Sequence, residues 1–300
     1  MKQLSVIILT YNSEKDIYDC LCSVYQYNDI GDDLEVIVVD NQSHGYKAMY
    51  ERLAKEYPQV HTIQNTHNGG YGQGNNVGIR VAQAPIVAIM NPDVRLVMPC
   101  FKMMLQQFDN PQVVMCGGKQ MYPNGKPGWS FACDYNIWGP IRIIARNIFK
   151  RFDHYNYKYM HLSGAFFLIR KDKFTQIGLF DEGLFMYGEE ADIHMRLRKT
   201  FPTNYMLFLP TITYLHLSSE RIFSEKQIKN TIHGDTYVFH KHHLPINSYF
   251  RTMLWTTSVL QIRALLQGQL KTFNDIAEQK KILRHEWKIY NQDTKIVRYK

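Results

Sequence analysis

Residues 4–12 read Leu-Ser-Val-Ile-Ile-Leu-Thr-Tyr-Asn, a short β-rich run that ends in polar side chains. The run 35–39 has the same character and is followed by Asp40. Further apolar runs at 60–63, 85–90 and 112–116 alternate with helical patterns at 46–57, 74–83 and 99–108. This alternation predicts an α/β fold with a mainly parallel central sheet and helices on both faces.

Polar residues follow four of these expected strands, and ligands of such sheets bind beyond the carboxyl ends of the strands. We therefore expect one crevice formed by residues 10–12, 40–43, 65–76 and 91–93. The glycine-rich stretch 69–78 looks like a dinucleotide fingerprint, but Val77 stands where the third glycine should be, and the stretch follows the third strand. It is read either as a close approach to a phosphate or sugar or as a plain tight turn.

The chain has 300 residues, of which 45% are hydrophobic, and this composition is that of an ordinary globular protein. Its length suggests one large domain or two modest ones. The apolar run 4–9 is too short for a signal peptide, so we expect a cytoplasmic protein. Five cysteines without zinc spacing indicate reduced, mostly structural thiols.

The positive charge is concentrated near the C-terminus. Residues 220–300 contain 14 Lys and Arg against 7 Asp and Glu, and the formal net charge of the whole chain is +8. A basic C-terminal part suggests an anionic partner such as a membrane surface, although solubility alone also explains it. We expect no nucleic-acid partner.

Three carboxylates gather in the stretch 184–197, Leu-Phe-Met-Tyr-Gly-Glu-Glu-Ala-Asp-Ile-His-Met-Arg-Leu. Ile193, Leu197 and Phe201 fall on one helical face, which places Glu189, Glu190 and Asp192 in the first helical turn. Acids are favoured at that position by the helix dipole, so capping alone is one explanation. The presence of three acids next to a glycine favours a second explanation, which is that the turn forms a chemical site.

Several motifs resemble glycosyltransferase family 2, with its GT-A fold, and within it the bacterial rhamnosyltransferase-like branch. The resemblance covers about residues 3–218 and depends on the order of the motifs. They are Val6-Ile-Ile-Leu-Thr-Tyr-Asn12, Val38-Val-Asp-Asn-Gln-Ser43, the glycine-rich stretch 68–78, Asn91-Pro-Asp93, Ser163-Gly-Ala-Phe-Phe-Leu-Ile-Arg170, Phe180-Asp-Glu182, Gly188-Glu-Glu-Ala-Asp192 and Leu215-His-Leu217.

The resemblance implies a GT-A catalytic domain over 1–219 and a basic helical C-terminal extension over 220–300. Within the first, residues 1–95 form the nucleotide-binding part and 96–219 the acceptor part. It further implies that the donor nucleotide contacts side chains after the first four strands, and that Asp40 receives the pyrimidine and ribose. The implied donor-binding residues are Thr10, Tyr11, Asn12, Asp40, Asn68, Gly70, Asn75 and Asn91.

By the same resemblance, Asp93 and His216 hold a divalent cation, Mn²⁺ or Mg²⁺, against the donor diphosphate. Asn91 stands where the family usually has a first carboxylate, so weak metal binding is expected without nucleotide. The plain alternatives are a strand-end turn for Asp93 and a core or pocket-edge position for His216, whose imidazole is compatible with Mn²⁺.

Glu190 aligns with the family's catalytic base, which removes a proton from the acceptor hydroxyl in an inverting transfer. Glu189 and Asp192 either tune this base or bind the acceptor, and Asp192 is also a rival base because Glu190 replaces the usual aspartate. The resemblance thus implies a metal-dependent transferase that uses a nucleoside-diphosphate sugar, dTDP-rhamnose or a UDP-sugar, in bacterial surface polysaccharide synthesis. Two alternatives are a sugar nucleotidyltransferase and a silent carbohydrate-binding or scaffold protein.

Two segments outside the motifs are amphipathic. Residues 138–152 pattern as a basic helix that either lies on an anionic bilayer or packs on the sheet, near a saccharide or lipid-linked acceptor. The sequence of residues 220–300 predicts helices, and one of their faces carries an apolar stripe. Three roles are compatible with this stripe: packing on the catalytic domain, peripheral binding to the inner face of the cytoplasmic membrane, or a homodimer interface. The stripe consists of Trp255, Val259, Ile262, Leu266, Leu270 and Phe273.

Overall fold

The computed structural model of the chain describes residues 1–134, 148–217 and 224–296. Internal contacts divide it into two units. The sheet unit contains the described residues of 1–132, 150–185 and 189–219, and the helical unit contains mainly 224–296. Most of the amphipathic segment expected at 138–152 lies outside the described residues.

The sheet unit contains eight strands in one sheet and a two-stranded sheet made of β7 and β8. The strands are β1 Leu4–Thr10, β2 Leu34–Asp40, β3 His61–Gln64, β4 Ile86–Met90, β5 Val94–Leu96, β6 Val113–Met121, β7 Phe131–Cys133, β8 Met160–Leu162, β9 Phe166–Arg170 and β10 Tyr205–His216. The helices are α1 Ile17–Gln26, α2 Tyr46–Glu56, α3 Gly70–Val81, α4 Phe101–Gln106, α7 Lys171–Gln176 and α8 Glu189–Thr200, with 3₁₀ turns at Gly31–Asp33 and Gln107–Asp109.

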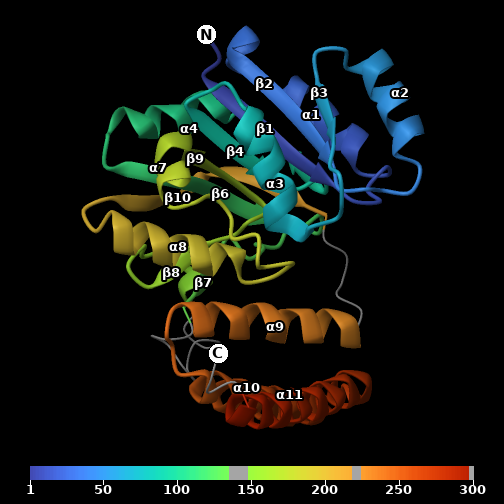
Figure 1. Cartoon of the computed structure of the whole chain (residues 1–300), viewed down its shortest axis with the longest axis vertical. Helices are drawn as coiled ribbons and strands as arrows, with labels where there is room; N and C mark the ends of the chain where they lie inside the picture. Colours follow the sequence, from blue (N-terminus) through green and yellow to red (C-terminus); the bar gives the residue numbers. More distant parts are fainter. Residues whose placement is uncertain (135–147, 218–223, 297–300) are drawn as a thin grey trace. The chain divides into compact units, whose positions relative to one another are not determined.

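The strand order of the large sheet is β3-β2-β1-β4-β9-β6-β10-β5 (Figure 1). The half β3-β2-β1-β4 is parallel throughout. Strand β9 then enters antiparallel between β4 and β6, β10 runs parallel to β6, and β5 runs antiparallel to β10. The expected parallel sheet therefore describes the first half, and the second half is mixed.

Helices cover both faces of this sheet, as the sequence predicted. Val6 and Ile8 of β1 share a core cluster with residues of α1, α2 and α4. The alternate side chains, Ile7 and Leu9, face α3, where Gly78 and Gly74 allow the helix backbone to approach the strand closely. Figure 1 shows α3 in front of the strands.

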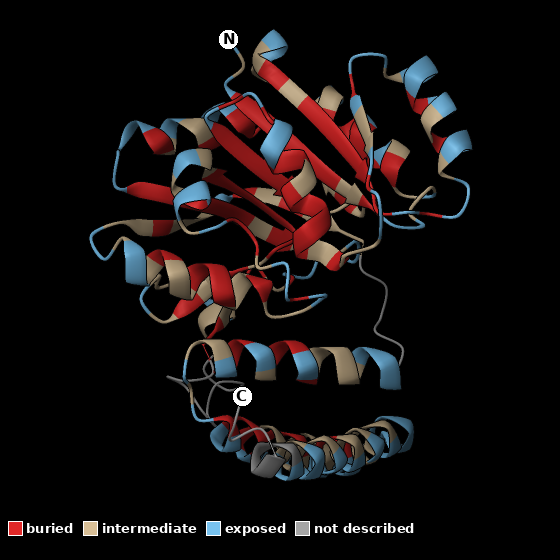
Figure 2. Cartoon of the chain, viewed as in Figure 1, coloured by how far each residue is buried: buried red, intermediate tan, exposed pale blue. Residues whose placement is uncertain are grey.

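Burial follows from these two covered faces. Strand β4 is buried at every position, and β1 and β2 at all but one each. Such strands read as continuous apolar runs, which is why they could be located from the sequence. In Figure 2 the central strands are mostly buried, whereas α2 exposes one side. Burial also raises the pKa of the Cys20 and Cys100 thiols to about 12, which keeps them protonated.

The helical unit contains α9 Glu225–Lys241, α10 Ile246–Leu266 and α11 Leu270–Ile296. A small core joins the three helices, and the Phe250 and Trp287 rings stack with centroids 5.8 Å apart. Gly268, with φ +67°, lies in the short turn between α10 and α11. The expected helical C-terminal region is confirmed. No helix among the residues that the structure describes has both the length and the apolar character needed to cross a membrane.

Candidate active site at the carboxyl edge of the sheet

The candidate site lies beside β1, where the order in which successive strands are added to the sheet reverses. Strand β1 has β2 on one side and β4 on the other, so the connections after these strands diverge to opposite sides. In open α/β sheets this divergence leaves a crevice at the carboxyl ends of the strands. Tyr11 and Asn12 follow β1 at this point, and Asn91 follows β4. Tyr11 is half exposed.

Asp40, at the end of β2, is fully buried, and its carboxylate accepts several hydrogen bonds. Oδ1 accepts from the Ser43 hydroxyl at 2.5 Å and the Thr10 hydroxyl at 3.2 Å, and Oδ2 accepts from the Ser43 backbone N–H at 2.9 Å. Ser43 Oγ also accepts from the Asn12 backbone N–H at 2.7 Å. Asp40 thus fixes the turn that carries Asn12, and its direct contact with a nucleoside stays a prediction.

A buried network of side-chain amides lies beside this turn, and sequence analysis had not singled it out. Asn65 Nδ2 donates to Asn41 Oδ1 at 2.7 Å and to Gln73 Oε1 at 2.5 Å. Asn41 Nδ2 donates to Asn68 Oδ1 at 2.8 Å and to the Gly70 carbonyl at 3.1 Å. The network ties the loops after β2 and β3 to α3. Its sequence signal was the accumulation of amides directly after two neighbouring strands.

Gly70 begins α3 in a backbone conformation that favours glycine, with φ +90°. A Cβ there would lie 2.0 Å from the Phe185 carbonyl oxygen, and the Tyr71 backbone N–H donates to the same oxygen at 2.9 Å. Asn75 is fully buried, and its Nδ2 donates to the Tyr71 carbonyl at 2.9 Å. Gly70 therefore brings α3 against the segment that precedes the acidic turn. Direct contacts of Gly70 and Asn75 with a donor stay predictions.

Asp93 and His216 face each other across β5 and the end of β10. Val94 pairs with His216 in the antiparallel ladder, and the Leu217 backbone N–H donates to the Asp93 carbonyl at 2.9 Å. This pairing places His216 Nε2 3.2 Å from Asp93 Oδ2. His216 Nδ1 is buried and has no hydrogen-bond partner in the described part of the chain. Two residues 123 positions apart in the sequence thus form one pair of potential metal ligands.

This pair fits a divalent cation that also binds a diphosphate. Within residues 1–134, 148–217 and 224–296, no group of three or more His, Cys, Asp or Glu side chains is placed to hold a metal ion. One carboxylate and one imidazole are a small donor set, but Mg²⁺ in phosphate-binding sites commonly takes only one or two protein ligands and completes its shell with phosphate oxygens and water. Asp93 and His216 are the residues that would hold it.

Glu190 lies in the first turn of α8 and is anchored to the loop before β9. Its Oε1 accepts from the Gly164 backbone N–H at 3.1 Å. The Tyr71 hydroxyl donates to the carbonyl of the same Gly164 at 2.8 Å. A Cβ on residue 164 would lie 2.5 Å from Glu190 Oε1, so glycine leaves room for the carboxylate.

His194 fixes the backbone of Glu190 one turn further along the helix. The Leu162 N–H donates to His194 Nε2 at 3.1 Å, so this nitrogen is an acceptor. His194 Nδ1 lies 2.7 Å from the Glu190 carbonyl oxygen, which can only accept, so Nδ1 carries the proton. The ring is therefore assigned as the neutral tautomer that joins α8 to β8, a positioning role that the sequence alone had not indicated.

The other two acids of the turn are buried. Glu189 is 4% exposed and Asp192 is fully buried. Arg196 donates to Asp192 Oδ2 from Nε at 2.8 Å and from Nη2 at 2.6 Å. The same guanidinium donates to the carbonyls of Ile177 at 2.5 Å and Leu179 at 2.7 Å. Asp192 thus orients an arginine that fastens the loop after α7.

Tyr71 lies next to the acidic turn, since its hydroxyl donates to the carbonyl of Gly164, whose N–H donates to Glu190. Burial raises the pKa of Tyr71 well above its ordinary value, and the negative charges of Glu190, Glu189 and Asp93 raise it further. A backbone hydrogen bond links the two segments, because the Asn91 N–H donates to the carbonyl of Ala165, the neighbour of Gly164, at 2.9 Å. Asp93 and Glu190 are therefore brought to one region of the sheet edge.

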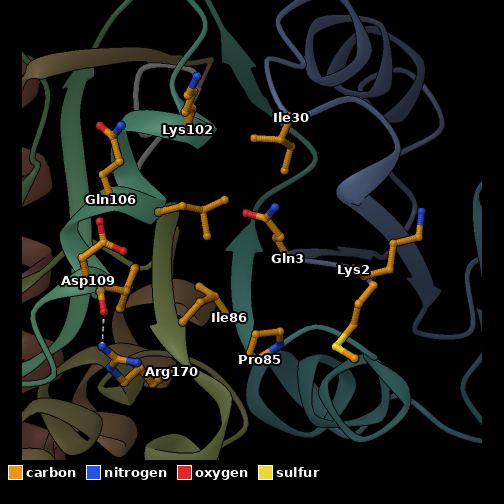
Figure 3. Close-up of a pocket in the computed structure, with 12 residues that line it drawn as sticks. Lys2, Gln3, Ile30, Pro85, Ile86, Lys102, Gln106, Asp109 and Arg170 are labelled. Atoms are coloured by element: carbon orange, nitrogen blue, oxygen red, sulfur yellow. Dashed lines mark hydrogen bonds between the residues drawn. The ribbon is translucent and has the colours of Figure 1, made fainter.

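The opposite edge of the same sheet carries a cavity of about 470 Å³ at the amino ends of β1 and β4 (Figure 3). Two of the cations that line it, Lys2 and Arg170, donate hydrogen bonds to backbone carbonyls. Lys2 Nζ donates to the carbonyls of Asp32 and Leu34 at 2.6 and 2.8 Å, and Arg170 Nε donates to the Val113 carbonyl at 2.8 Å. The cavity holds none of the sequence-predicted site residues.

Comparison with known proteins identifies the family. The family model described as glycosyl transferase family 2 matches residues 5–178. A hexosyltransferase of low-salt glycan biosynthesis, Agl10 of Haloferax volcanii, is 26% identical over 204 residues, which are 66% of this chain and 62% of that protein. A poly(ribitol-phosphate) beta-glucosyltransferase of Bacillus spizizenii is 31% identical over 93 residues, 30% of this chain and 15% of that protein. The chain thus spans about three fifths of the length of the first of these relatives.

Among solved structures, the mannosyltransferase PcManGT of Pyrobaculum calidifontis, in complex with GDP-Man and Mn²⁺, superposes with a TM-score of 0.62. The alignment covers 99% of this chain and 81% of that one, at 14% identity. At this identity the likeness establishes the fold alone, which is the GT-A fold expected from the motifs.

Proposed function

We propose that this chain, which belongs to glycosyl transferase family 2, is an inverting glycosyltransferase that moves a sugar from a nucleoside diphosphate to a hydroxyl group of a glycan acceptor. One observation carries the proposal: the Asp93–His216 pair and Glu190 lie at the same edge of the sheet, where Asn91 is hydrogen-bonded to Ala165 and Glu190 to the neighbouring Gly164. A transferase of this kind needs a counter-charge for the leaving diphosphate and a base for the acceptor, and these residues can supply both.

In the proposed reaction, the acceptor oxygen attacks the anomeric carbon and its proton passes to the Glu190 carboxylate. The bond from the anomeric carbon to the diphosphate oxygen breaks, and that oxygen keeps the electron pair. Asp93 and His216 would hold a divalent cation, which would supply positive charge to stabilise the departing diphosphate. The Gly164 N–H and the His194 ring hold the side chain and backbone of Glu190 in place during the transfer.

Glu190 is favoured over Asp192 as the base because a base must come within hydrogen-bond reach of the acceptor hydroxyl. Asp192 has no exposed surface, and two hydrogen bonds bind it to Arg196. Glu190 is only partly buried and accepts one backbone hydrogen bond. We assign Asp192 to positioning the helix and Glu189 to the negative field around the base.

The proposal also covers the identity of the donor and of the acceptor. The donor is dTDP-rhamnose or a UDP-sugar, and the acceptor is a saccharide or lipid-linked glycan of a cell-surface polymer. Two relatives support this direction by name, one from glycan biosynthesis and one that glucosylates poly(ribitol-phosphate). Mn²⁺ is the cation to test first because PcManGT contains it.

The test has two steps. Thermal unfolding of the full chain is first measured with UDP, dTDP, GDP and CDP, each with and without Mn²⁺, because selective binding raises the unfolding temperature. The sugar donors of the selected base are then incubated with the enzyme and products are quantified. Release of nucleoside diphosphate supports the transferase. Release of pyrophosphate instead identifies a sugar nucleotidyltransferase, and binding without turnover identifies a silent carbohydrate-binding or scaffold protein.

A further inference from the structure

Helix α10 is apolar on two opposite faces. One face supplies Ile246, Tyr249 and Phe250 to the core of the helical unit. The other face carries an exposed row that we call the α10 stripe. It consists of Trp255, Val259, Ile262 and Leu266, which are 45%, 42%, 60% and 82% exposed.

The spacing makes this row one continuous surface. Its residues stand at i, i+4, i+7 and i+11, which places them above one another on one side of a helix. Leu265 and Leu270, 55% and 67% exposed, widen the row at its end. A helix that already buries one apolar face gains nothing in water from a second, so the α10 stripe indicates a second apolar partner.

The charges around the stripe have one sign. No Asp or Glu occurs between residues 236 and 274, whereas Lys241, Arg251, Arg263 and Lys271 fall in that interval. Arg251 precedes Trp255 by one helical turn, and Arg263 follows Ile262 directly. Arg251, Arg263 and Lys271 are all exposed. By contrast, α11 mixes acidic and basic side chains along its length.

We propose that the α10 stripe docks on an anionic lipid surface, with the helix lying parallel to the bilayer. Aliphatic side chains of the stripe enter the boundary between headgroups and acyl chains, and the exposed cations face lipid phosphates. Tryptophan suits this boundary because its ring is apolar and its N–H finds a polar partner. The absence of carboxylates from this interval removes the repulsion that anionic headgroups would otherwise meet.

A second copy of this chain fits the α10 stripe less well. In a two-fold symmetric contact the same patch faces itself, so the cations Arg251, Arg263 and Lys271 of one copy would approach the equally basic patch of the other. Like charges placed opposite each other oppose association, and the interval 236–274 contains no acid to offset them. Charge complementarity therefore selects the lipid surface.

The inference goes beyond the proposed transferase, because lipid binding requires neither donor nor acceptor. The experiment is co-sedimentation of the full chain with vesicles of phosphatidylcholine alone and of phosphatidylcholine mixed with phosphatidylglycerol. We expect binding to the mixed vesicles, weakened as salt rises from about 0.1 M to about 0.5 M because exposed charges are then screened. Loss of donor turnover with intact lipid binding would leave this proposal standing.

Two variants separate the two contributions. Ile262→Asp combined with Leu266→Asp is expected to weaken binding to mixed vesicles at least about tenfold by removing apolar burial. Arg251→Gln combined with Arg263→Gln is expected to weaken it about tenfold by removing attraction to anionic lipid. The matched control is Ile289→Asp, an exposed apolar position on α11 that lies outside the stripe and should leave binding unchanged.

Far-ultraviolet circular dichroism and thermal unfolding establish that each variant folds, which is expected because all substituted side chains are exposed. Three results would overturn the proposal: equal sedimentation with both kinds of vesicle, no sedimentation with either, or a dimer in sedimentation equilibrium that the Ile262→Asp and Leu266→Asp pair converts to monomer. The last result would assign the α10 stripe to self-association.

Discussion

Four of the carboxylates near the carboxyl edge of the sheet fall into two pairs with different surroundings. Asp40 and Asp192 are fully buried, and each accepts at least two charge-assisted or hydroxyl hydrogen bonds from neighbouring groups. Asp93 and Glu190 are partly exposed, and each has one close polar partner, His216 and the Gly164 N–H respectively. The first pair shapes the loops, and the second pair keeps the capacity to bind and react.

The difference teaches that a carboxylate's position in a motif does not decide its role. Glu190 and Asp192 are two residues apart in one helical turn, yet only Asp192 is saturated by an arginine. The predictions below test whether this division is correct.

Glu190→Gln should have the largest effect. We expect turnover to fall by about 10³- to 10⁴-fold, because the amide cannot accept the acceptor proton. The thermal shift caused by nucleotide and Mn²⁺ should be nearly unchanged, because the substitution keeps size and hydrogen-bonding capacity. Glu190→Asp serves as the control and should retain part of the activity. Full turnover by Glu190→Gln would move the base elsewhere and break the comparison.

Asp192→Asn should act on stability. The substitution leaves the Arg196 charge buried without its counter-charge, and loss of one partner of such a pair lowers the free energy of unfolding by about 3 kcal/mol. Urea unfolding followed by circular dichroism measures the change. The double variant Asp192→Asn with Arg196→Met removes both charges and should recover part of the loss. If Asp192→Asn instead unfolds like wild type but has no turnover, Asp192 is the base.

Asp93→Asn should abolish the metal-dependent part of nucleotide binding. A ligand at a hundredfold excess over its Kd stabilises the folded protein by about 2.7 kcal/mol, and we expect most of this gain to disappear when Mn²⁺ loses its carboxylate ligand. Differential scanning fluorimetry with and without Mn²⁺ measures it. His216→Gln should give a smaller loss in the same direction. An undiminished shift in Asp93→Asn would place the cation at other residues.

Tyr71→Phe should have the smallest effect and sharpens the distinction between positioning and chemistry. The substitution removes the hydrogen bond to the Gly164 carbonyl, a contribution of about 1 kcal/mol. We therefore expect kcat to fall about fivefold with little change in KM for the donor. Tyr27→Phe, at the end of α1, is the matched control. A donor KM that rises while kcat stays constant would assign Tyr71 to substrate binding.

The first half of the sheet could be predicted because its signal is local. Strands β1, β2 and β4 are buried on both faces and therefore appear as unbroken apolar runs. The second half could not be predicted in the same way. Strand β9 enters antiparallel between β4 and β6, and this pairing depends on contacts between residues 50 or more positions apart. No local pattern encodes such a pairing.

The candidate site likewise contains features that the sequence could predict and features that it could not. The approach of Asp93 to His216 could be expected, because a motif order shared with a family carries long-range information that a single pattern lacks. The network of Asn41, Asn65 and Gln73 could not, because amides after strands are common in ordinary turns. The saturation of Asp192 by Arg196 was also hidden, since an i, i+4 pair of opposite charges is usually an exposed helix pair.

The contact between Gly70 and Phe185 joins two parts of the proposed mechanism at the level of the main chain. Residue 70 begins the glycine-rich helix α3, beside the loops that follow β2 and β3, and residue 185 lies four positions before the acidic turn. Because the Tyr71 N–H binds the carbonyl of Phe185 and a side chain at residue 70 would collide with it, the two segments move together. A sugar nucleotide that shifts the start of α3 would carry residue 185 with it, so the displacement would reach the segment that leads into Glu189 and Glu190.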